Sequence, residues 1–297
     1  MSTKFLVIGG TGMIGSKFIN YFIKKNQDFQ YTYLNNHLPF AGGYKLDITK
    51  KNDVIDCIDK VQPNIVIHTT ALVNVDLCQI NNELAYSINV KGTENIINAC
   101  KKNNSKIIYI STSAIFDGKK EQYFEDDQPN PISYYGTTKY LSEEKIRNSD
   151  LDYLILRTDQ PYCWIEKWQH MNYVIRVLQS SQSSKIHKEI SDWYNTPTYV
   201  PNFVEATARL VGKNKNGIFH IVGSDYISRY DWSLIICNIF GLEKKNIIPF
   251  NSDELKFPAK RANANLSNQK VIEEIGIKML GVEEGLKQML NDSSTYS

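Results

Sequence analysis

Two residues of this chain have the types and the spacing for proton transfer. Tyr135 and Lys139 stand four positions apart in a segment with helical periodicity, which puts both side chains on one face. A free tyrosine has a pKa of about 10, too high for acid–base catalysis at neutral pH, and a nearby ammonium group lowers it. The pair therefore predicts proton exchange with an alcohol, although an ordinary surface helix can carry the same spacing.

A glycine pattern near the start of the chain suits a dinucleotide. Gly9, Gly12 and Gly15 follow an apolar run over 4–8 and precede apolar residues at helical spacing. Glycines at a strand-to-helix turn let the backbone approach a pyrophosphate, and the helix N-terminus offers it free N–H groups. A tight turn without a ligand is the alternative, but the position between strand and helix favours a dinucleotide site.

Hydroxyl groups end a second apolar run, over 106–110. Ser111, Thr112 and Ser113 come directly after it. The carboxyl ends of parallel strands face the crevice where such sheets bind ligands, so one hydroxyl could hydrogen-bond a substrate carbonyl beside Tyr135. The alternative is that these hydroxyls only cap the end of the strand, which would give the same sequence pattern. The three signals together predict hydride transfer with a nicotinamide, coupled to proton transfer with an alcohol.

The elements that must position these residues alternate between strand and helix, which predicts an α/β fold with a doubly wound, Rossmann-type parallel sheet. Expected strands are 4–8, 30–34, 65–68, 106–110, 153–156 and 217–222. Expected helices are 14–25, 51–60, 82–103, 134–148, 231–240 and 268–274. The polar segment 118–131, which contains prolines, is expected to be an active-site loop.

Composition narrows the class of protein. The 297 residues are 42% hydrophobic with a net charge of +2, which gives no reason to expect nucleic acid as a partner. No apolar run approaches about 20 residues and no signal peptide is evident, so we expect a cytoplasmic protein without a membrane partner. The five cysteines are scattered without zinc-site spacing, and we expect free thiols and no metal.

Nine short segments of the sequence follow one another in the order known for one protein superfamily. They are residues 9–15, 46–49, 63–71, 89–92, 111–118, 123–131, 135–139, 156–158 and 196–198. In order and spacing they resemble the extended short-chain dehydrogenase/reductase superfamily, and within it the dTDP-4-dehydrorhamnose reductase family. The β subunit of methionine adenosyltransferase shares that branch. Placement in the branch depends mainly on 115–118 and on the Pro-Thr segment at 196–198.

This resemblance implies a role for each matched residue. Thr112 is the hydroxyl partner, Tyr135 the catalytic acid and Lys139 its activator. Asp47 is expected to bind the adenine amino group and Asn89 to belong to the proton-relay framework. The implied cofactor contacts are Gly9, Thr11, Gly12, Met13, Ile14, Gly15, Asn35, Asp47, Ile48, Thr70, Ala71, Asn89, Tyr135 and Lys139. The implied substrate contacts are Asn74, Ser113 and Arg261, the last as a cation near a diphosphate.

The resemblance also implies domains and an activity. A dinucleotide-binding domain over 1–160, with returns near 190–235, would carry a smaller C-terminal substrate lobe made of 161–190 and 236–297. The expected reaction is reduction of the C4 ketone of a nucleotide-linked 4-keto-6-deoxy sugar, as in dTDP-rhamnose biosynthesis. A homodimer is compatible with this family. An NADP-binding regulatory subunit without catalysis and a nucleotide-sugar C4 epimerase are the alternatives.

Two stretches bear on cofactor and substrate choice. Residues 31–37 contain no Asp or Glu to bind a ribose 2′-hydroxyl, so NADP(H) is the expected cofactor, with NAD(H) as the alternative. The chain departs from the family at Ser113-Ala114, at Arg261-Ala262 and in the aromatic stretch 159–192. Ser113 and Ala114 cannot do the acid–base chemistry of a dehydratase. These departures lie where the sugar nucleotide is expected, so they affect substrate choice.

Overall fold

A seven-stranded parallel sheet forms the centre of the larger part of the molecule. The computed structural model describes residues 3–38, 42–181 and 187–295. The strand order is β11-β6-β5-β4-β1-β2-β3, and every neighbouring pair is parallel. The strands are β1 (Lys4–Ile8), β2 (Asp28–Tyr33), β3 (Gly43–Lys45), β4 (Ile65–His68), β5 (Lys106–Thr112), β6 (Tyr153–Thr158) and β11 (Gly217–His220). The predicted doubly wound α/β fold is therefore confirmed.

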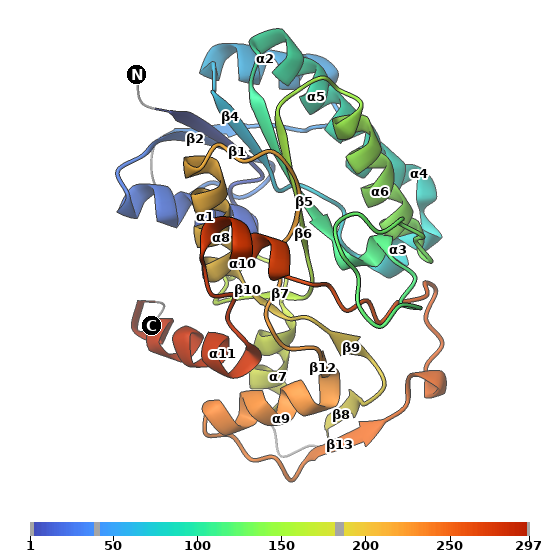
Figure 1. The fold of residues 1–297 in the computed structure, drawn as a ribbon. Coiled ribbons are helices and arrows are strands. Elements are labelled where there is room, and N and C mark those ends of the chain that lie inside the picture. Colours follow the sequence, from blue (N-terminus) through green and yellow to red (C-terminus); the bar gives the residue numbers. More distant parts are fainter. Residues whose placement is uncertain (1–2, 39–41, 182–186, 296–297) are drawn as a thin grey trace.

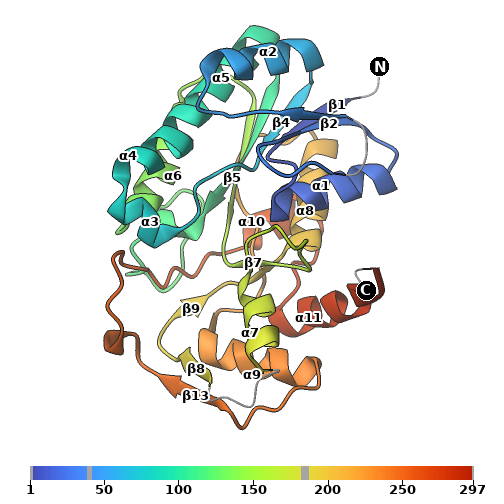
Figure 2. The ribbon, with the colours of Figure 1, turned by 180° about the vertical axis from the view of Figure 1, so that it is seen from behind.

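Helices cover both faces of this sheet (Figures 1 and 2). On one face α1 (Met13–Lys24), α8 (Val200–Gly212) and α10 (Gln269–Ile275) pack with the side chains of alternate strand residues, such as Val7 and Ile108. On the other face α2 (Lys51–Val61), α5 (Gly92–Asn103) and α6 (Tyr134–Arg147) pack with the intervening residues, such as Leu6 and Ile107. Strands covered on both faces have to be apolar throughout, and this is why they read as continuous apolar runs.

The strand order reverses direction between β1 and β4. The chain builds β1, β2 and β3 outward to one side and then crosses back through α2 to place β4 on the other side of β1. At such a switch point the loops after the strands diverge and leave a crevice at their carboxyl ends. The glycine turn after β1 and the Ser/Thr cluster at the end of β5 both lie at this edge.

A smaller lobe lies beside the carboxyl edge of the sheet (Figure 1). Its elements are α7 (Tyr173–Ser181), α9 (Arg229–Ile239), α11 (Val282–Asn291), and the parallel pair β8 (His187–Ile190) and β13 (Ile247–Phe250). Two short pairs join it to the sheet: β7 (Pro161–Tyr162) with β10 (Thr198–Tyr199), and β9 (Tyr194–Asn195) with β12 (Ile227–Ser228). The fully buried Trp232 stacks on Tyr173 with ring centroids 4.5 Å apart and anchors the packing of α7 on α9.

Some expected elements differ from the observed ones. The expected helix 82–103 is divided into α4 (Asn82–Tyr86), a π-helical turn (Ser87–Lys91) and α5. The expected strand 30–34 is β2, which lies at 28–33, and the expected helix 231–240 is α9, which begins at its Ser228 cap. Helices α3 (Val75–Ile80), α7, α8 and α11 were not expected from the sequence.

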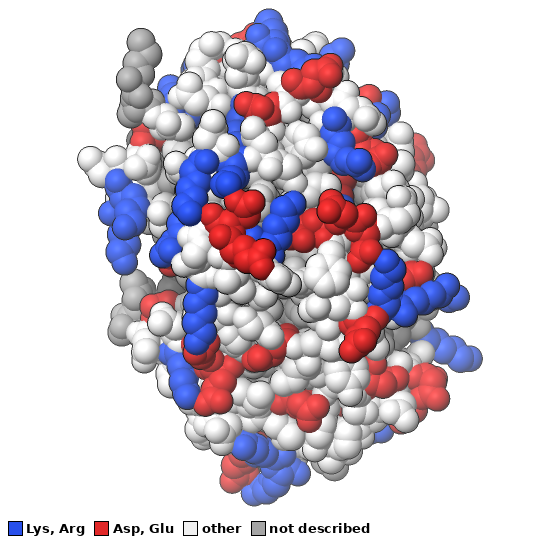
Figure 3. Space-filling model, in the orientation of Figure 1, with Lys and Arg blue, Asp and Glu red and all other residues white. Residues whose placement is uncertain are grey.

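Charged side chains of both signs are interspersed over the surface seen in Figure 3, which agrees with the small net charge of the sequence. Among the described residues no helix is long and apolar enough to cross a membrane. The same residues contain no group of three or more His, Cys, Asp or Glu that could hold a metal ion.

Candidate active site

The glycine turn after β1 is shaped for close approach of an anion. Gly9 has φ +84°, and a Cβ there would lie 2.4 Å from the Thr70 hydroxyl oxygen. A Cβ on Gly15 would lie 2.3 Å from the carbonyl oxygen of Gly9, so helix α1 can pack against the turn only with glycine there. The N-cap of α1 is Gly12, which has no side chain to satisfy the first N–H groups of the helix. Those free donors fit a pyrophosphate.

A segment of the smaller lobe lies directly against this turn. The indole N–H of Trp168 and the side-chain amide of Gln169 both donate to the carbonyl oxygen of Thr11, at 3.3 and 3.0 Å. The Gln169 amide also donates to the Ser16 hydroxyl at 3.1 Å. We call residues 168–172 the strap. It joins the lobe to the glycine turn at the mouth of the candidate cofactor site.

One cavity of about 900 Å³ extends from the glycine turn to the smaller lobe, lined by residues of both parts. Most of the predicted site residues line it: Gly9, Thr11, Gly12, Met13, Ile14, Asn35, Asp47, Ile48, Thr70, Ala71, Thr112, Ser113, Tyr135, Lys139 and Arg261. Such a volume is in the range of small-molecule and cofactor sites.

Three predicted contacts lie outside the lining of this cavity. Gly15 is buried behind the turn, where it permits the packing of α1. Asn74 caps α3, and its side-chain oxygen accepts from the N–H of Leu77 at 2.9 Å. Asn89 lies in the π-helical turn and is buried. None of these three residues lines the cavity, so no direct contact with a ligand in it is seen for them.

Asn89 connects the segment after β4 to α6. Its side-chain oxygen accepts from the N–H of Leu72 at 2.7 Å, and its amide nitrogen donates to the Thr138 hydroxyl at 3.0 Å. Its backbone carbonyl accepts from the hydroxyls of Thr93 and Ser142. Irregular helical turns of this kind are frequent near functional sites. Here the turn holds the Asn89 side chain against Thr138, the residue that precedes Lys139 on α6.

Tyr135 and Thr112 meet where β5 and α6 converge on the cavity. Tyr135 lies in the first turn of α6, and Thr112 is the last residue of β5. Burial raises the pKa of Tyr135 to about 12, while a hydrogen bond with the Thr112 side chain opposes that rise. The pKa lowering expected from Lys139 is therefore not found. Desolvation of the phenolate outweighs the other effects at this position.

Lys139 is turned toward the strand beside it. Its Nζ donates to the backbone carbonyl of Ile110 at 2.7 Å and lies 4.0 Å from the centre of the Tyr109 ring. Burial lowers the pKa of this lysine to about 7. The Tyr109 ring in turn lies against His68, and burial lowers the pKa of that imidazole to about 3, which keeps it neutral.

Ser113, predicted as a substrate contact, is held by a carboxylate that the sequence analysis did not single out. Its hydroxyl donates to Asp159 at 2.8 Å, and the same carboxylate accepts from the N–H of Thr196 at 2.8 Å. Burial raises the pKa of Asp159. Asp159 follows the end of β6, so a polar residue after an apolar strand was the signal that could have identified it.

Arg261 lines the cavity, but its charge is already paired. Its guanidinium makes two hydrogen bonds to Asp76, at 2.9 and 2.7 Å, and a third to the carbonyl of Ala259 at 2.7 Å. These contacts hold the pKa of Asp76 below its usual range. Three of its five N–H donors are therefore engaged within the protein, and its charge is balanced by Asp76.

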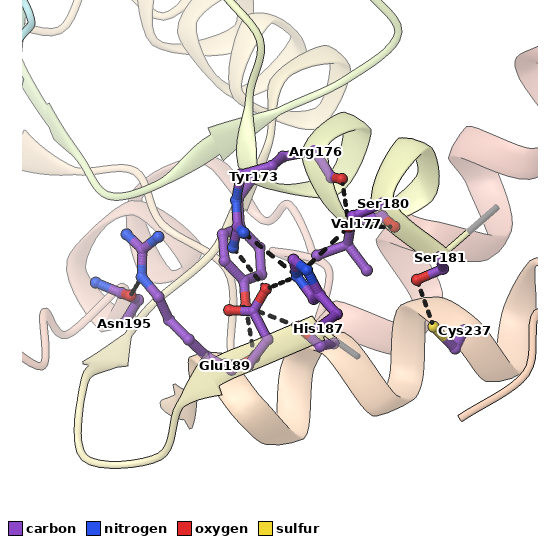
Figure 4. A network of polar contacts seen from close by, with 11 residues as sticks. Tyr173, Arg176, Val177, Ser180, Ser181, His187, Glu189, Asn195 and Cys237 are labelled. Carbon is purple, nitrogen blue, oxygen red and sulfur yellow. Dashed lines mark hydrogen bonds and ion pairs between the residues drawn. The ribbon is translucent and has the colours of Figure 1, made fainter. Parts of the chain in front are cut away.

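A second cationic cluster, in the smaller lobe, was missed by sequence reasoning. Arg176, Arg229, Tyr173, Trp193 and Asn195 all line the same cavity. Figure 4 shows the Glu189 carboxylate between Tyr173, Arg176 and His187. The only signal in the sequence was the density of aromatic residues in this part of the chain.

Sequence comparisons agree with this geometry. A model of the RmlD substrate binding domain family matches residues 3–295. The chain is 30% identical to a dTDP-4-dehydrorhamnose reductase of Aggregatibacter actinomycetemcomitans, over 82% of this chain and 86% of the relative. It is 28% identical to the spore coat polysaccharide biosynthesis protein SpsK of Bacillus subtilis, over 99% of each. It is 24% identical to methionine adenosyltransferase 2 subunit beta of Bos taurus, over 97% and 88%.

Solved structures share the fold over nearly the whole chain. A dTDP-4-dehydrorhamnose reductase from Clostridium acetobutylicum matches with a TM-score of 0.87 at 26% identity, covering 98% of this chain and all of that one. The enzyme of the same name from Bacillus anthracis, solved with NADP, matches with a TM-score of 0.88 at 24% identity and the same coverage. A UDP-glucose 4-epimerase of Thermus thermophilus, solved with NAD, has a TM-score of 0.86 at 18% identity, over 97% and 98%.

The family match over almost the full length, the doubly wound sheet and the resemblance drawn from the motifs agree with one another. The chain belongs to the RmlD substrate-binding domain family, within the extended short-chain dehydrogenases/reductases related to dTDP-4-dehydrorhamnose reductase and to the β subunit of methionine adenosyltransferase.

Proposed function

We propose that this protein is an NADP(H)-preferring reductase of the C4 ketone of a nucleotide-linked 4-keto-6-deoxy sugar. The observation that carries the proposal is the meeting of Tyr135 and Thr112 in the cavity that also contains the uncapped N-terminus of α1. One wall can thus hold a dinucleotide while the other holds hydroxyl donors for a carbonyl group. The dTDP-4-dehydrorhamnose reductases among the relatives support this choice of reaction.

The raised pKa of Tyr135 suits the direction of reduction. A bound nicotinamide would supply hydride to the carbonyl carbon. With a pKa of about 12, Tyr135 is a neutral phenol at pH 7, so it holds the proton that a developing alkoxide requires. The Thr112 hydroxyl is hydrogen-bonded to Tyr135, so both hydroxyl groups can face the carbonyl oxygen of the substrate. Lys139 has donors to spare beyond its bond to Ile110 and can hold the nicotinamide ribose.

Asn35 and Asn36 support the preference for NADP(H). Both line the cavity just after β2, where enzymes that select NAD carry a carboxylate for the ribose 2′-hydroxyl. A carboxylate there would repel a 2′-phosphate, whereas neutral amides leave room for it. NAD(H) remains the alternative cofactor.

A direct assay tests the proposed reaction. Purified protein is mixed with NADPH and a panel of dTDP- and UDP-linked 4-keto-6-deoxy sugars, and the loss of NADPH absorbance is followed. We expect turnover with at least one sugar, and faster turnover with NADPH than with NADH. Binding of NADPH without oxidation by any sugar of the panel would exclude the reductase.

A regulatory subunit is the second candidate, because a methionine adenosyltransferase β subunit is among the relatives. The departure at Ser113-Ala114, in the expected sugar site, also favours it over a typical reductase. This role predicts NADPH binding without turnover and a stable complex with a methionine adenosyltransferase catalytic subunit. A C4 epimerase, the other alternative, would be purified with its nicotinamide bound.

A further inference from the structure

Arg229 occupies an unusual position in the lobe side of the cavity. It is the first residue of α9, and its backbone N–H donates to the carbonyl of Trp193 at 2.9 Å. Its guanidinium carbon lies 4.7 Å from the centre of the Tyr173 ring and 5.5 Å from that of Trp193. Its Nε donates to the side-chain oxygen of Asn195 at 3.3 Å. Two aromatic rings and one amide thus fix the plane of the guanidinium.

The rest of this guanidinium is unsatisfied. Within the parts of the chain that the structure describes, no acceptor lies within hydrogen-bond distance of Nη1 or Nη2, and no carboxylate forms an ion pair with Arg229. Glu189 is occupied by Tyr173 and Arg176, and Asp159 by Ser113 and Thr196. The four N–H donors of Nη1 and Nη2 have no partner within the described protein, and the residue lines the cavity, so they are available to a ligand there.

Other arginines of the molecule make the contrast clear. The fully buried Arg157 is paired with Glu143 at 2.8 Å, and the half-buried Arg261 with Asp76 at 2.7 Å. Arg229 is only partly buried, where it lines the cavity, and desolvation lowers the pKa of its guanidinium. Among the described residues no carboxylate forms an ion pair with it, unlike in the other two cases. A positive potential therefore persists at this point of the cavity.

Of two further cations near Arg229, only Lys260 adds to that potential, because the charge of Arg176 is paired with Glu189. Arg176 places its guanidinium carbon 4.8 Å from the same Tyr173 ring, and Figure 4 shows it held there by Glu189. Lys260 lines the cavity and forms no ion pair with any carboxylate that the structure describes. A ligand group with more than one negative charge, such as a diphosphate, fits this surplus better than a single carboxylate does.

A chain of polar contacts joins Arg229 to the reaction centre. Its Nε bonds to Asn195, the Asn195 side chain bonds to Asp159, and Asp159 accepts from Ser113, the neighbour of Thr112. The guanidinium therefore opens into the part of the cavity next to the catalytic hydroxyls, on the side of the lobe. The glycine turn, with its candidate pyrophosphate site, lies on the opposite side of the cavity, which the main sheet forms.

We propose that Arg229 binds the diphosphate of the substrate, with Nη1 and Nη2 donating to phosphoryl oxygens. This rests on the proposed function only in naming the diphosphate as part of a sugar nucleotide. The aromatic rings and Asn195 hold the guanidinium flat and oriented, so the planar fork is ready to form a bidentate contact. Arg261, whose charge is paired with Asp76, takes no part in this contact.

Binding measurements without turnover test the assignment. Calorimetry on the whole chain compares dTDP and UDP with thymidine and uridine, for the wild type, Arg229→Gln, Arg229→Lys and the control Arg209→Gln. Arg209 is an exposed arginine paired with Glu205 on α8. We expect Arg229→Gln to weaken dTDP or UDP binding about tenfold or more, Arg229→Lys to weaken it less, and nucleoside affinity to stay unchanged. NADPH affinity should be the same in all four proteins, which also shows that the variants are folded.

Three results would overturn the assignment. The first is unchanged dTDP and UDP affinity in Arg229→Gln. The second is an equal loss for nucleosides and nucleoside diphosphates, which would mean that Arg229 only supports the fold of the site. The third is a loss for UDP-glucuronate that exceeds the loss for UDP, which would assign the guanidinium to a carboxylate. None of these binding measurements requires catalysis. Failure of the Arg229 assignment can therefore be distinguished from failure of the proposed reductase activity.

Discussion

At the scale of single residues, the site depends on how burial sets each proton affinity. Tyr135 keeps its proton because the phenolate would be desolvated, and Lys139 loses part of its proton affinity for the same reason. Tyr, Thr and Lys could be identified from spacing and order in the sequence. Their depth could not, because burial depends on helices α3 and α6 and on the lobe that closes over them.

The phenolic proton of Tyr135 should be indispensable for turnover. Replacement by phenylalanine removes the proton donor but keeps the ring, so we expect kcat with NADPH and an accepted sugar to fall about 10²–10⁴-fold. NADPH affinity should stay within a few fold, as measured by fluorescence titration. The matched control is Tyr134→Phe, since Tyr134 is the neighbouring tyrosine and lies outside the cavity lining. Equal turnover by the two variants would refute the role of Tyr135.

Lys139 should make stability depend on pH in a definite direction. Its folded pKa of about 7 lies below the ordinary 10.5, so between these values the unfolded chain binds more protons at this residue. The contribution of Lys139 to stability is therefore lowest below about pH 7 and rises toward pH 10. We expect urea midpoints of the wild type to gain on those of Lys139→Met as pH rises from 7 to 10. A constant difference between the two proteins would contradict the lowered pKa.

At the scale of elements, the strap is the contact that links the lobe to the glycine turn on the sheet side of the cavity. It holds Thr11 and Ser16 through Trp168 and Gln169, directly over the glycine turn. No sequence pattern predicted this segment, because its residues form neither helix nor strand and its partners lie more than 150 positions away. Contacts of such separation are a product of the tertiary fold.

Removing the Gln169 side chain should loosen the strap. Each of its two hydrogen bonds to the glycine turn and α1, to Thr11 and Ser16, has a net value of about 1 kcal/mol, so we expect Gln169→Ala to speed NADPH release about fivefold or more, with kcat of the chemical step unchanged. Stopped-flow displacement of bound NADPH measures the release. Gln288→Ala, at an exposed position of α11, is the control and should behave as the wild type. Identical release rates in both variants would show that the strap does not retain the cofactor.

A buried ion pair fixes α6 to the sheet at the same scale. Glu143 on α6 accepts from Arg157 on β6 at 2.8 Å, and Ser111 also donates to it. Both charged side chains are almost fully buried, at 0% and 2% exposure.

Breaking this pair should be costly. In Glu143→Gln the Arg157 charge stays buried without its partner, and we expect a loss of about 3–5 kcal/mol in the free energy of unfolding. Glu144→Gln, in the exposed pair with Arg147 one residue along, should cost less than about 1 kcal/mol. Urea unfolding measures both. Similar losses in the two variants would show that burial of the pair adds nothing.

At the scale of the whole molecule, sequence patterns predicted the sheet well and the lobe poorly. Six of the seven sheet strands and the helices α1, α2, α6 and α10 carry apolar runs or helical periodicity strong enough to recognise locally. The lobe is built from short strands such as β8 and β9, whose partners β13 and β12 lie 30 to 60 positions further along. Pairing between such distant segments sets these elements, and local periodicity carries no trace of it.

This interleaving has a consequence for how the chain is made. Strand β8 pairs with β13, yet between them the chain returns to the main sheet as α8 and β11. On the ribosome the main sheet can be completed once residue 220 has emerged, whereas the lobe must wait until residue 250 for its second strand. During that interval the nascent chain presents the finished glycine turn beside a lobe in which β8 still lacks its partner strand.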